Sequence, residues 1–410
     1  MQVAVVGGGA AGFFLAITLK TISPQTHVVI LERQQRVLAK VAVSGGGRCN
    51  CTNTFRDVVD LQHVYPRGHR LIKRLFNTFG PADAQRWFQD HGVPLAIQPD
   101  QCIFPASQDS QTIIDCLLST ARRLGVELRL GVRIDSLDDL ENFDAVAIAT
   151  GGAPQQRMLD WLHLDPSDFE APVPSLFSLA IDNANLNQLM GVVVPNASVS
   201  IASTNFKAQG ALLLTHWGVS GPAILKISSY AARHLAQQDY KVQLCINWLN
   251  GTEEEARNTL DRMAKENKLK LLSNTHPQSL TQRLWNHILL RAQLVEPKLG
   301  SDGSDVLCTR RWTDVGKKDI NRLVSTLTAD TYATIGRAPF RDEFVTCGGL
   351  KLKMVDPNTL QHKKHPNLFF AGEVLDIDGI TGGFNFQAAW TTGFVAAHGV
   401  AKFIEGLCKS

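Results

Sequence analysis

Apolar segments alternate with glycine-rich turns at the start of the chain, and this pattern predicts its first elements. Residues 3–6 form an apolar strand pattern, residues 10–20 repeat with a helical period, and residues 28–31 form a second apolar strand that ends at Glu32. Between the first strand and the helix stands Gly7-x-Gly9-x-x-Gly12. A strand, this glycine spacing, a helix and a strand that ends in an acid are typical of a dinucleotide-binding βαβ unit.

Each glycine of this turn has a separate physical role in such a unit. Gly7 permits the tight turn, Gly9 removes a side chain that would block a pyrophosphate, and Gly12 allows the helix to pack closely on the strand. The helix N-terminus then points at the phosphates. Glu32 is expected to accept hydrogen bonds from a ribose.

The pattern changes several times further along the chain. Residues 44–53 contain three consecutive glycines without a helix or strand pattern, and residues 145–149 form a buried strand that reaches Thr150-Gly151-Gly152. Near the C-terminus, residues 367–370 form an apolar strand before Ala371-Gly372-Glu373. The other predicted helices are 68–92, 108–125, polar helices within 253–327 and a closing helix 388–404, and the other predicted strands are 126–130, 131–134, 178–181, 192–194, 197–201, 211–215, 242–246 and a strand from Gly348.

This order of elements predicts an α/β fold with a Rossmann-type domain formed by both chain ends. An inserted β-rich plus helical domain interrupts it. The expected boundaries are residues 1–185 for the N-terminal part, 186–252 for a barrel-like β-rich subdomain, 253–340 for a helical subdomain and 341–410 for the C-terminal part. A chain of 410 residues is long enough for two or three such cores.

Composition narrows the picture only slightly. The uncharged run at residues 1–19 has no basic region before it and is interrupted by glycines, so it predicts neither a signal peptide nor a membrane span, and we expect a cytoplasmic protein. Eight cysteines without a CxxC pair argue against a zinc site, any other metal site and a redox-active disulfide. A net charge of +3 does not by itself indicate a nucleic-acid partner.

The C-terminal strand, the N-terminal glycine turn and the internal Ala149-Thr150-Gly151 segment together favour FAD over NAD. Three further segments carry a resemblance: Lys40 with Ser44-Gly45-Gly46-Gly47-Arg48-Cys49-Asn50, Thr215-His216-x-Gly218-Val219-Ser220-Gly221-Pro222, and Ala371-Gly372-Glu373 with Asp378-Gly379-x-Thr381-Gly382-Gly383-Phe384-Asn385. With these motifs the chain resembles the YhiN/BaiN-type flavoprotein family from residue 1 to about residue 400. The resemblance implies a glutathione-reductase-like FAD-binding domain with the insertion over the flavin.

The resemblance also implies which residues hold the cofactor. The expected cofactor-binding residues are Gly7, Gly9, Ala11, Gly12, Glu32, Arg33, Lys40, Gly45, Gly46, Gly47, Ile134, Ala149, Thr150, Gly151, Gly372, Glu373, Gly383, Phe384 and Asn385. A helix that starts near Gln387 would direct its positive end toward the flavin, where negative charge develops on reduction. The alternative for Gly382-Gly383 is an ordinary helix N-cap turn.

The candidates for catalysis are Cys49, His216 and Arg48, with Tyr65 as a weaker one. The Cys49 thiol could protonate a substrate carbon, and Arg48 could lower the thiol pKa or bind an anion. The alternative is a buried structural cysteine. His216 faces the site only if the insertion folds over the flavin, and its alternative is a structural histidine.

Basic residues bear on the substrate. Three groups stand out: Arg67, Arg70, Lys73 and Arg74; Arg310, Arg311, Lys317 and Lys318; and His362 to His365. Each group could be an ordinary solvated face or could bind a phosphate backbone.

The resemblance implies reduction of a C=C bond conjugated with a carbonyl, and three functions stay open. The first is conversion of a uridine of large-subunit ribosomal RNA to dihydrouridine. The second is reduction or dehydrogenation of a small conjugated enone such as a steroid dienone, and the third is a non-enzymatic FAD-binding protein. Because no second glycine fingerprint occurs, NAD(P)H is expected to bind only transiently as reductant. The sequence does not indicate the oligomeric state.

Overall fold

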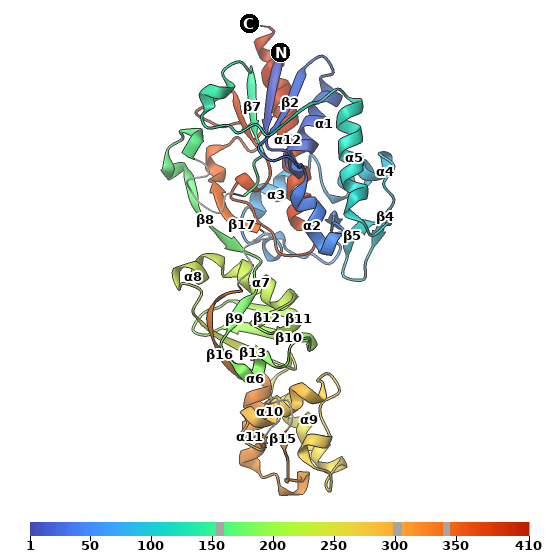
Figure 1. Ribbon diagram of the computed structural model, residues 1–410, viewed down its shortest axis with the longest axis vertical. Helices are drawn as coiled ribbons and strands as arrows, with labels where there is room; N and C mark the ends of the chain where they lie inside the picture. Colours follow the sequence, from blue (N-terminus) through green and yellow to red (C-terminus); the bar gives the residue numbers. More distant parts are fainter. Residues whose placement is uncertain (153–159, 298–305, 339–344, 410) are drawn as a thin grey trace. The chain divides into compact units, whose positions relative to one another are not determined.

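The chain folds into two compact units, shown in Figure 1. The structure is a computed structural model that describes residues 1–152, 160–297, 306–338 and 345–409. Unit 1 combines Met1–Pro174 with Phe344–Ser410, and unit 2 is Ser175–Glu343. Both ends of the chain therefore belong to one unit, as the order of the elements predicts.

A five-stranded parallel sheet with the order β18-β7-β1-β2-β6 forms the centre of unit 1. Its inner strands are mostly apolar because helices cover both faces, and β7, which reads Ala-Val-Ala-Ile, is buried throughout. The strands of unit 1 are β1 (Gln2–Val6), β2 (His27–Glu32), β3 (Thr52–Asn53), β4 (Leu95–Ile97), β5 (Cys102–Pro105), β6 (Glu127–Leu130), β7 (Ala145–Ile148), β8 (Phe169–Ser175), β17 (Val345–Leu350) and β18 (Leu368–Phe370).

Two long helices from opposite ends of the chain pack together in unit 1 (Figure 1). Gly393 of α12 allows the close approach, since a Cβ there would lie 2.9 Å from the carbonyl oxygen of Ala11 in α1. The Phe14 ring of α1 contacts Trp87 and Trp390, which joins a third helix to the pair. The helices of unit 1 are α1 (Ala10–Ile22), α2 (Ala39–Gly47), α3 (His69–Leu75), α4 (Pro81–Asp90), α5 (Ser110–Arg123) and α12 (Phe384–Leu407).

Unit 2 begins with a closed barrel in the strand order β10-β11-β12-β9-β16-β13. Alternate residues of β10, including Val199 and Ile201, point into the barrel core, which is the period of two expected for a strand with one buried face. The strands of unit 2 are β9 (Leu179–Ile181), β10 (Val193–Ile201), β11 (Lys207–Thr215), β12 (Gly218–Ser220), β13 (Gln243–Asn247), β14 (Glu296–Pro297), β15 (Val306–Leu307) and β16 (Asp330–Arg337).

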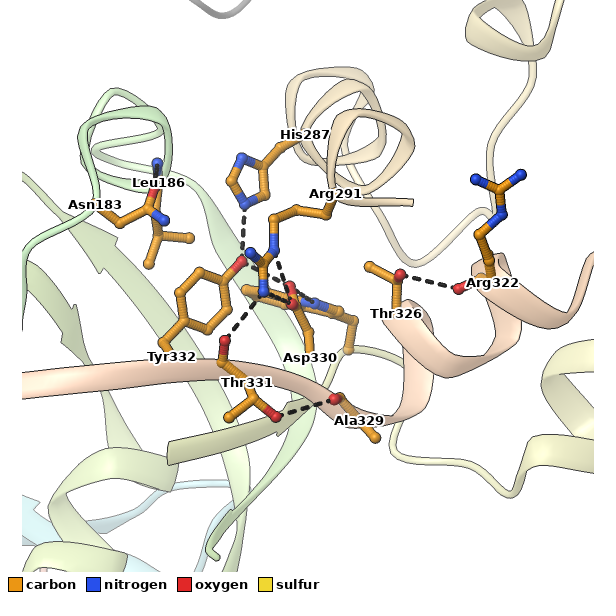
Figure 2. Close-up of polar contacts among 11 residues, drawn as sticks. Asn183, Leu186, His287, Arg291, Arg322, Thr326, Ala329, Asp330, Thr331 and Tyr332 are labelled. Atoms are coloured by element: carbon orange, nitrogen blue, oxygen red, sulfur yellow. Dashed lines mark hydrogen bonds and ion pairs between the residues drawn. The ribbon is translucent and has the colours of Figure 1, made fainter. Parts of the chain in front are cut away.

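A buried polar network joins the barrel to the helices that follow it (Figure 2). Asp330 of β16 accepts hydrogen bonds from the Tyr332 hydroxyl at 2.6 Å and from Arg291 of α10 at 2.7 Å. His287 of α10 lies 2.8 Å from the same hydroxyl, and burial lowers its pKa to about 4, so its ring is neutral at pH 7. The helices of unit 2 are α6 (Ala184–Asn187), α7 (Pro222–Tyr230), α8 (Ala232–Gln237), α9 (Glu253–Glu266), α10 (Gln282–Arg291) and α11 (Lys317–Ala329).

Several predicted elements differ from those of the structure. Residues 131–134 are not a strand, because Gly131 with φ +69° ends β6. The helix expected over 68–92 is two helices, since Pro81 starts α4 and cannot continue a helix from α3. The strands expected at 192–194 and 197–201 are one strand, β10, with an irregular register between Val194 and Ala197.

Three further elements differ in extent. Residues 39–47 contain α2, where no helix was expected, and α2 is interrupted at Ser44, Gly45 and Gly46. The closing helix begins at Phe384 rather than at residue 388. The first unit boundary lies at Pro174 rather than at residue 185, because β9 pairs with β12 and β16 and so belongs to the barrel. The boundary expected at residues 340/341 lies outside the described residues.

Candidate functional site

The candidate site lies at the edge of the parallel sheet where β1, β7 and β18 end. Backbone hydrogen bonds continue beyond these strands, from the Ala149 N–H to the Val6 carbonyl at 2.8 Å and from the Ala371 N–H to the Ile148 carbonyl at 3.0 Å. The glycine turn after β1, the Ala149-Thr150-Gly151 segment and the Ala371-Gly372-Glu373 segment are therefore neighbours. In open parallel sheets, this edge is where ligands bind.

The three glycines of the Gly7-x-Gly9-x-x-Gly12 motif divide into two that the fold needs and one that leaves space. Gly7 has φ +114°, and a Cβ there would lie 2.3 Å from the Ala149 carbonyl oxygen. A Cβ on Gly12 would lie 2.0 Å from the Gly7 carbonyl oxygen. By contrast, a Cβ on Gly9 would meet no atom of the described residues within 4 Å. The open side of the turn at Gly9 has room for a phosphate group beside the N-terminus of α1.

Glu32 ends β2 beside this turn. Its carboxylate accepts hydrogen bonds from the Gly8 N–H at 2.8 Å and from the Gln34 N–H at 2.7 Å. A carboxylate offers about four lone-pair sites, so two of them stay available for ribose hydroxyls. Arg33 is exposed next to Glu32. Ile134 lies in the segment after β6, the edge strand that pairs with β2.

A second group of expected cofactor-binding residues meets around Glu373. Its carboxylate forms an ion pair with Lys40 of α2 at 2.8 Å and accepts a hydrogen bond from the Thr346 N–H at 2.7 Å. Gly372 has φ +77°, and a Cβ there would lie 2.8 Å from the Cβ of Ala11. These contacts bring residues that are more than 300 positions apart in the sequence to the N-terminus of α1.

The three consecutive glycines at the end of α2 adopt backbone conformations that favour glycine. Gly45, Gly46 and Gly47 all have positive φ, at +56°, +68° and +84°. A Cβ on Gly46 or Gly47 would meet no atom within 4 Å, whereas one on Gly45 would lie 3.0 Å from the Phe104 ring. Two of the three glycines therefore present bare backbone to open space.

Contacts with the segment after this loop fix the N-terminus of α12. Gly383 has φ +86°, and a Cβ there would lie 2.3 Å from the Thr52 carbonyl oxygen. In the amide orientation that satisfies both neighbours, the Asn50 side chain accepts from the Gly383 N–H at 3.1 Å and donates to Thr52 at 3.0 Å. The Thr52 hydroxyl also donates to the Gln387 side chain at 2.5 Å. The positive end of α12 is thus held in one position.

Asn385 organises the loop that precedes α12. Its side chain accepts a hydrogen bond from the Gly379 N–H at 2.8 Å and donates to the Gly379 carbonyl at 2.9 Å. Asp378 is fully buried and forms a two-point ion pair with Arg67, with one contact at 2.6 Å. Neither role was expected from the sequence. Asn385 and Gly379 are six positions apart, whereas Arg67 and Asp378 are 311 positions apart and only folding brings them together.

Tyr65 is held as a structural residue. It is fully buried, its hydroxyl donates to the Phe384 carbonyl at 2.7 Å, and burial raises its pKa well above the usual value. The hydroxyl therefore caps a carbonyl in the first turn of α12 and has no exposed face for a substrate.

The environment of Cys49 differs from the one suggested by its neighbour Arg48. Cys49 is fully buried, and desolvation raises its pKa to about 12. Arg48 lies over the Phe104 ring at 4.6 Å and donates to the Gly45 carbonyl at 3.1 Å. The suggestion that Arg48 lowers the pKa of this thiol was wrong, because burial dominates and the guanidinium is held elsewhere.

His216 and the first and third basic groups do not gather in one unit of the structure. His216 belongs to unit 2, where it is exposed in the turn between β11 and β12. In the first basic group, the Arg67 guanidinium forms an ion pair with Asp378. In the third, His362 is buried and Lys364 pairs with Asp168 at 3.0 Å. The described residues contain no cluster of three or more His, Cys, Asp or Glu side chains that could hold a metal ion.

The parallel sheet, the open glycine turn, the acid at the end of β2 and the anchored N-terminus of α12 define an FAD-binding α/β oxidoreductase. The residues present fit this cofactor, since Gly9, Gly46 and Gly47 leave bare backbone facing open space. Among the described residues, no helix combines the length and hydrophobicity needed to cross a membrane.

Comparisons with known proteins identify the family. The HI0933-like protein Rossmann domain matches residues 1–158, and the HI0933-like protein barrel and H2TH domain matches residues 173–345. The chain belongs to this family of FAD-dependent oxidoreductases.

Curated relatives match over almost their full length. A ribosomal RNA dihydrouridine synthase of Escherichia coli is 28% identical and covers 96% of both chains. A 3-dehydro-bile acid delta(4,6)-reductase of Clostridium scindens is 25% identical and covers 98% of this chain and 99% of its own. Among solved structures, a 3-ketosteroid delta1-dehydrogenase of Sterolibacterium denitrificans is 11% identical with a TM-score of 0.46, covering 98% of this chain and 99% of its own. That likeness does not bear on the substrate.

Proposed function

We propose that this protein reduces a C=C bond conjugated with a carbonyl, and that its substrate is a uridine of large-subunit ribosomal RNA, which becomes dihydrouridine. The observation that carries the choice of RNA is a concentration of exposed Lys and Arg side chains in unit 2, around Lys268, Lys270 and Arg311. A polyanion is attracted to many cations at once, whereas a small enone with at most a single carboxylate does not need such a surface. The Escherichia coli relative named as a ribosomal RNA dihydrouridine synthase supports the same choice.

The residues that would hold FAD follow from the site. The backbone of the Gly7-to-Gly12 turn would bind the pyrophosphate, and Glu32 would accept hydrogen bonds from the adenosine ribose. The bare backbone of Gly46 and Gly47 and the N-terminus of α12 would lie against the flavin side. FAD, when bound and reduced by NAD(P)H, would supply the hydride for the C=C bond. The partial positive charge of α12 stabilises negative charge that develops beside it.

The proposed proton donor to the substrate is one of three candidates from the sequence: Cys49, Tyr65 or His216. The Cys49 thiol keeps its proton at neutral pH, but it has no exposed surface from which to reach a substrate. Tyr65 is equally buried and is bonded to Phe384. His216 is the exposed candidate, and we propose it as the donor to the substrate carbon. We also propose NAD(P)H as the transient reductant and the cytoplasm as the location.

A small conjugated enone is the second candidate substrate. The Clostridium scindens relative, named as a bile acid reductase, covers nearly the whole chain at an identity close to that of the Escherichia coli relative. Both substrates present a C=C bond conjugated with a carbonyl, so the same flavin site serves either. The distinction lies in whether the protein binds a phosphate backbone.

The test is an anaerobic half-reaction. The FAD-loaded protein is reduced with NADPH or NADH and then mixed with ribosomal RNA that lacks dihydrouridine, or with a panel of small enones. We expect RNA to reoxidise the flavin and to acquire dihydrouridine, as measured by mass spectrometry of the digested RNA. Reoxidation by enones alone would reject the RNA substrate and support the second candidate. RNA that already contains dihydrouridine at the target serves as the matched control.

A further inference from the structure

One end of the helical part of unit 2 is built from two short segments that are bonded to each other. The first follows α9 and contains Lys268 and Lys270, and the second contains Arg310 to Thr313. The Thr313 N–H donates to the Lys268 carbonyl at 3.1 Å, and the Trp312 N–H donates to the Lys270 carbonyl at 3.2 Å. Lys268 and Lys270, which lie 43 and 41 positions before Arg311 in the sequence, are thereby placed beside it.

The charge of these segments is strongly unbalanced. With the adjoining turns of α9 and α11 included, the two segments span residues 262–276 and 309–322. Together these ranges contain nine Lys or Arg residues and three Asp or Glu residues. Asp319 pairs with Arg310 at 2.5 Å and with Arg322 at 2.8 Å, so it neutralises arginines inside the group. Asp314 accepts a hydrogen bond from the Arg311 backbone N–H at 2.8 Å. Two of the three acids, Asp314 and Asp319, thus hold the segments in place, and the third, Glu266, is exposed.

Seven of these nine cationic side chains are exposed and lie outside the Asp319 ion pairs, and we call six of them, all except Arg262, the basic end. They are Lys265, Lys268, Lys270, Arg311, Lys317 and Lys318. None of the six forms an ion pair with a carboxylate in the part of the chain that the structure describes. Lysine and arginine side chains on a folded surface, without acids to neutralise them, attract a polyanion.

The backbone beneath the basic end is tied to a packed core. Trp312 is buried, and its indole N–H donates to the Thr275 hydroxyl at 2.6 Å. Leu272 is fully buried, and its carbonyl accepts the indole N–H of Trp285 at 2.8 Å. The cations therefore stand on fixed backbone, and less conformational entropy is lost when they bind a ligand than in a disordered basic tail.

We propose that the basic end is the surface on which the phosphate backbone of an RNA docks. This inference rests on the proposed function, and it assigns the partner's phosphates to named residues of unit 2. Each phosphate neutralised by a lysine or arginine releases condensed counterions, so affinity falls with salt in proportion to the number of contacts. Leu269, which is 74% exposed between Lys268 and Lys270, offers an apolar contact to an unstacked base.

The test removes three charges from the full-length, FAD-loaded protein with the triple variant Lys268→Ala, Lys270→Ala, Arg311→Ala. Binding to a ribosomal RNA fragment is measured by fluorescence anisotropy at several salt concentrations. We expect the slope of log K against log salt to become shallower by roughly two to three, at about 0.7 to 0.9 for each lost contact. Affinity near 0.1 M salt should fall by at least about tenfold. The thermal midpoint and the flavin content should match the wild type because the three side chains are exposed.

The matched control removes three exposed charges from unit 1 with Arg122→Ala, Arg123→Ala and Lys402→Ala. An equal loss of slope in both triple variants would overturn the proposal, because it would indicate a general charge effect. A wild-type protein that does not bind RNA, or that binds an acidic polypeptide at the basic end instead, would also overturn it. Dihydrouridine formation is scored separately. If the wild type forms dihydrouridine and the triple variant keeps the wild-type slope of log K against log salt, the basic end is rejected and the proposed reaction stands. If the wild type binds RNA through the basic end but forms no dihydrouridine, the proposed reaction is rejected and the basic end stands.

Discussion

At the scale of single residues, two glycines of the first turn are required for different reasons. Gly12 is required by packing, because its Cβ would overlap the Gly7 carbonyl. Gly9 has an extended backbone conformation with φ −92°, which any residue can adopt, and its Cβ would touch no atom of the described residues. Only a ligand in that space would make Gly9 necessary.

The substitution Gly9→Ala tests this distinction. We expect it to fold with a thermal midpoint near that of the wild type and to bind FAD at least about tenfold more weakly, because the added methyl group occupies the pyrophosphate position. Gly12→Ala should instead lower the free energy of unfolding by about 1–3 kcal/mol through overpacking. Calorimetric titration of the apoprotein with FAD and thermal unfolding measure both effects. Normal FAD affinity in Gly9→Ala would contradict the proposed cofactor position.

The buried Cys49 thiol leads to a prediction about alkaline stability. Its pKa is raised to about 12 from an ordinary value of 9.0, so the unfolded chain loses this proton first as pH rises. The buried neutral thiol makes its full contribution to the free energy of unfolding below pH 9, and this contribution is lost between pH 9 and 12.

The stability difference between the wild type and Cys49→Ala should therefore shrink by about 1.4 kcal/mol per pH unit above pH 9. Denaturant unfolding between pH 8 and 11 measures this difference. Cys408→Ala, which changes an exposed thiol, serves as the control and should show no such slope. Parallel curves for the wild type and Cys49→Ala would mean that the thiol is not buried as described.

At the scale of elements, the N-terminus of α12 depends on segments from other parts of the chain. The Tyr65 hydroxyl bonds to Phe384, the Asn385 side chain holds Gly379, and Asp378 in the same loop is paired with Arg67. The loop before α12 is therefore fixed by these side chains and by backbone bonds to distant segments, such as that from the Ile380 N–H to the Val64 carbonyl at 2.9 Å.

The substitution Asp378→Asn tests how far the loop depends on the buried ion pair. We expect a loss of about 3–5 kcal/mol in the free energy of unfolding, because the Arg67 charge would remain buried without its carboxylate partner. FAD affinity should fall with it, since α12 would lose its fixed position. Arg74→Ala, which removes an exposed charge, should change stability by less than about 0.5 kcal/mol. Chemical unfolding and FAD titration of both variants provide the comparison.

At the scale of the whole molecule, the insertion leaves and re-enters unit 1 through neighbouring strands. β8 leads into unit 2, β17 follows it, and the two pair as a two-stranded sheet. The backbones approach so closely that a Cβ on Gly348 would lie 2.6 Å from the Ala171 carbonyl oxygen. A short connection can therefore replace the insertion without separating these strands.

A protein in which a short Gly/Ser linker replaces residues 175–343 should fold as unit 1 and bind FAD. The reason is that every cofactor-binding residue proposed for FAD lies in unit 1. It should bind ribosomal RNA at least about tenfold more weakly than the full chain, because the basic end is removed. Flavin absorbance after purification and RNA anisotropy measure the two properties. A colourless product that is nevertheless folded would show that unit 2 contributes to cofactor binding.

The sequence alone determined the parts of this protein that local pattern controls. The glycine spacing after β1, the acid at the end of β2 and the apolar strands predicted the sheet, and the positions of both chain ends predicted the insertion. These features could be predicted because short-range sterics and periodic burial act on neighbouring residues.

Only the tertiary structure decided the features that join distant segments. The burial of Cys49, the ion pair of Arg67 with Asp378 and the bonding of Lys268 to Thr313 each depend on residues that are far apart along the chain. Charge and thiol chemistry are set by desolvation and by partners, which the linear order of residues does not specify. The sequence therefore predicted the cofactor class, whereas folding decided which side chains stay available for chemistry and for binding a partner.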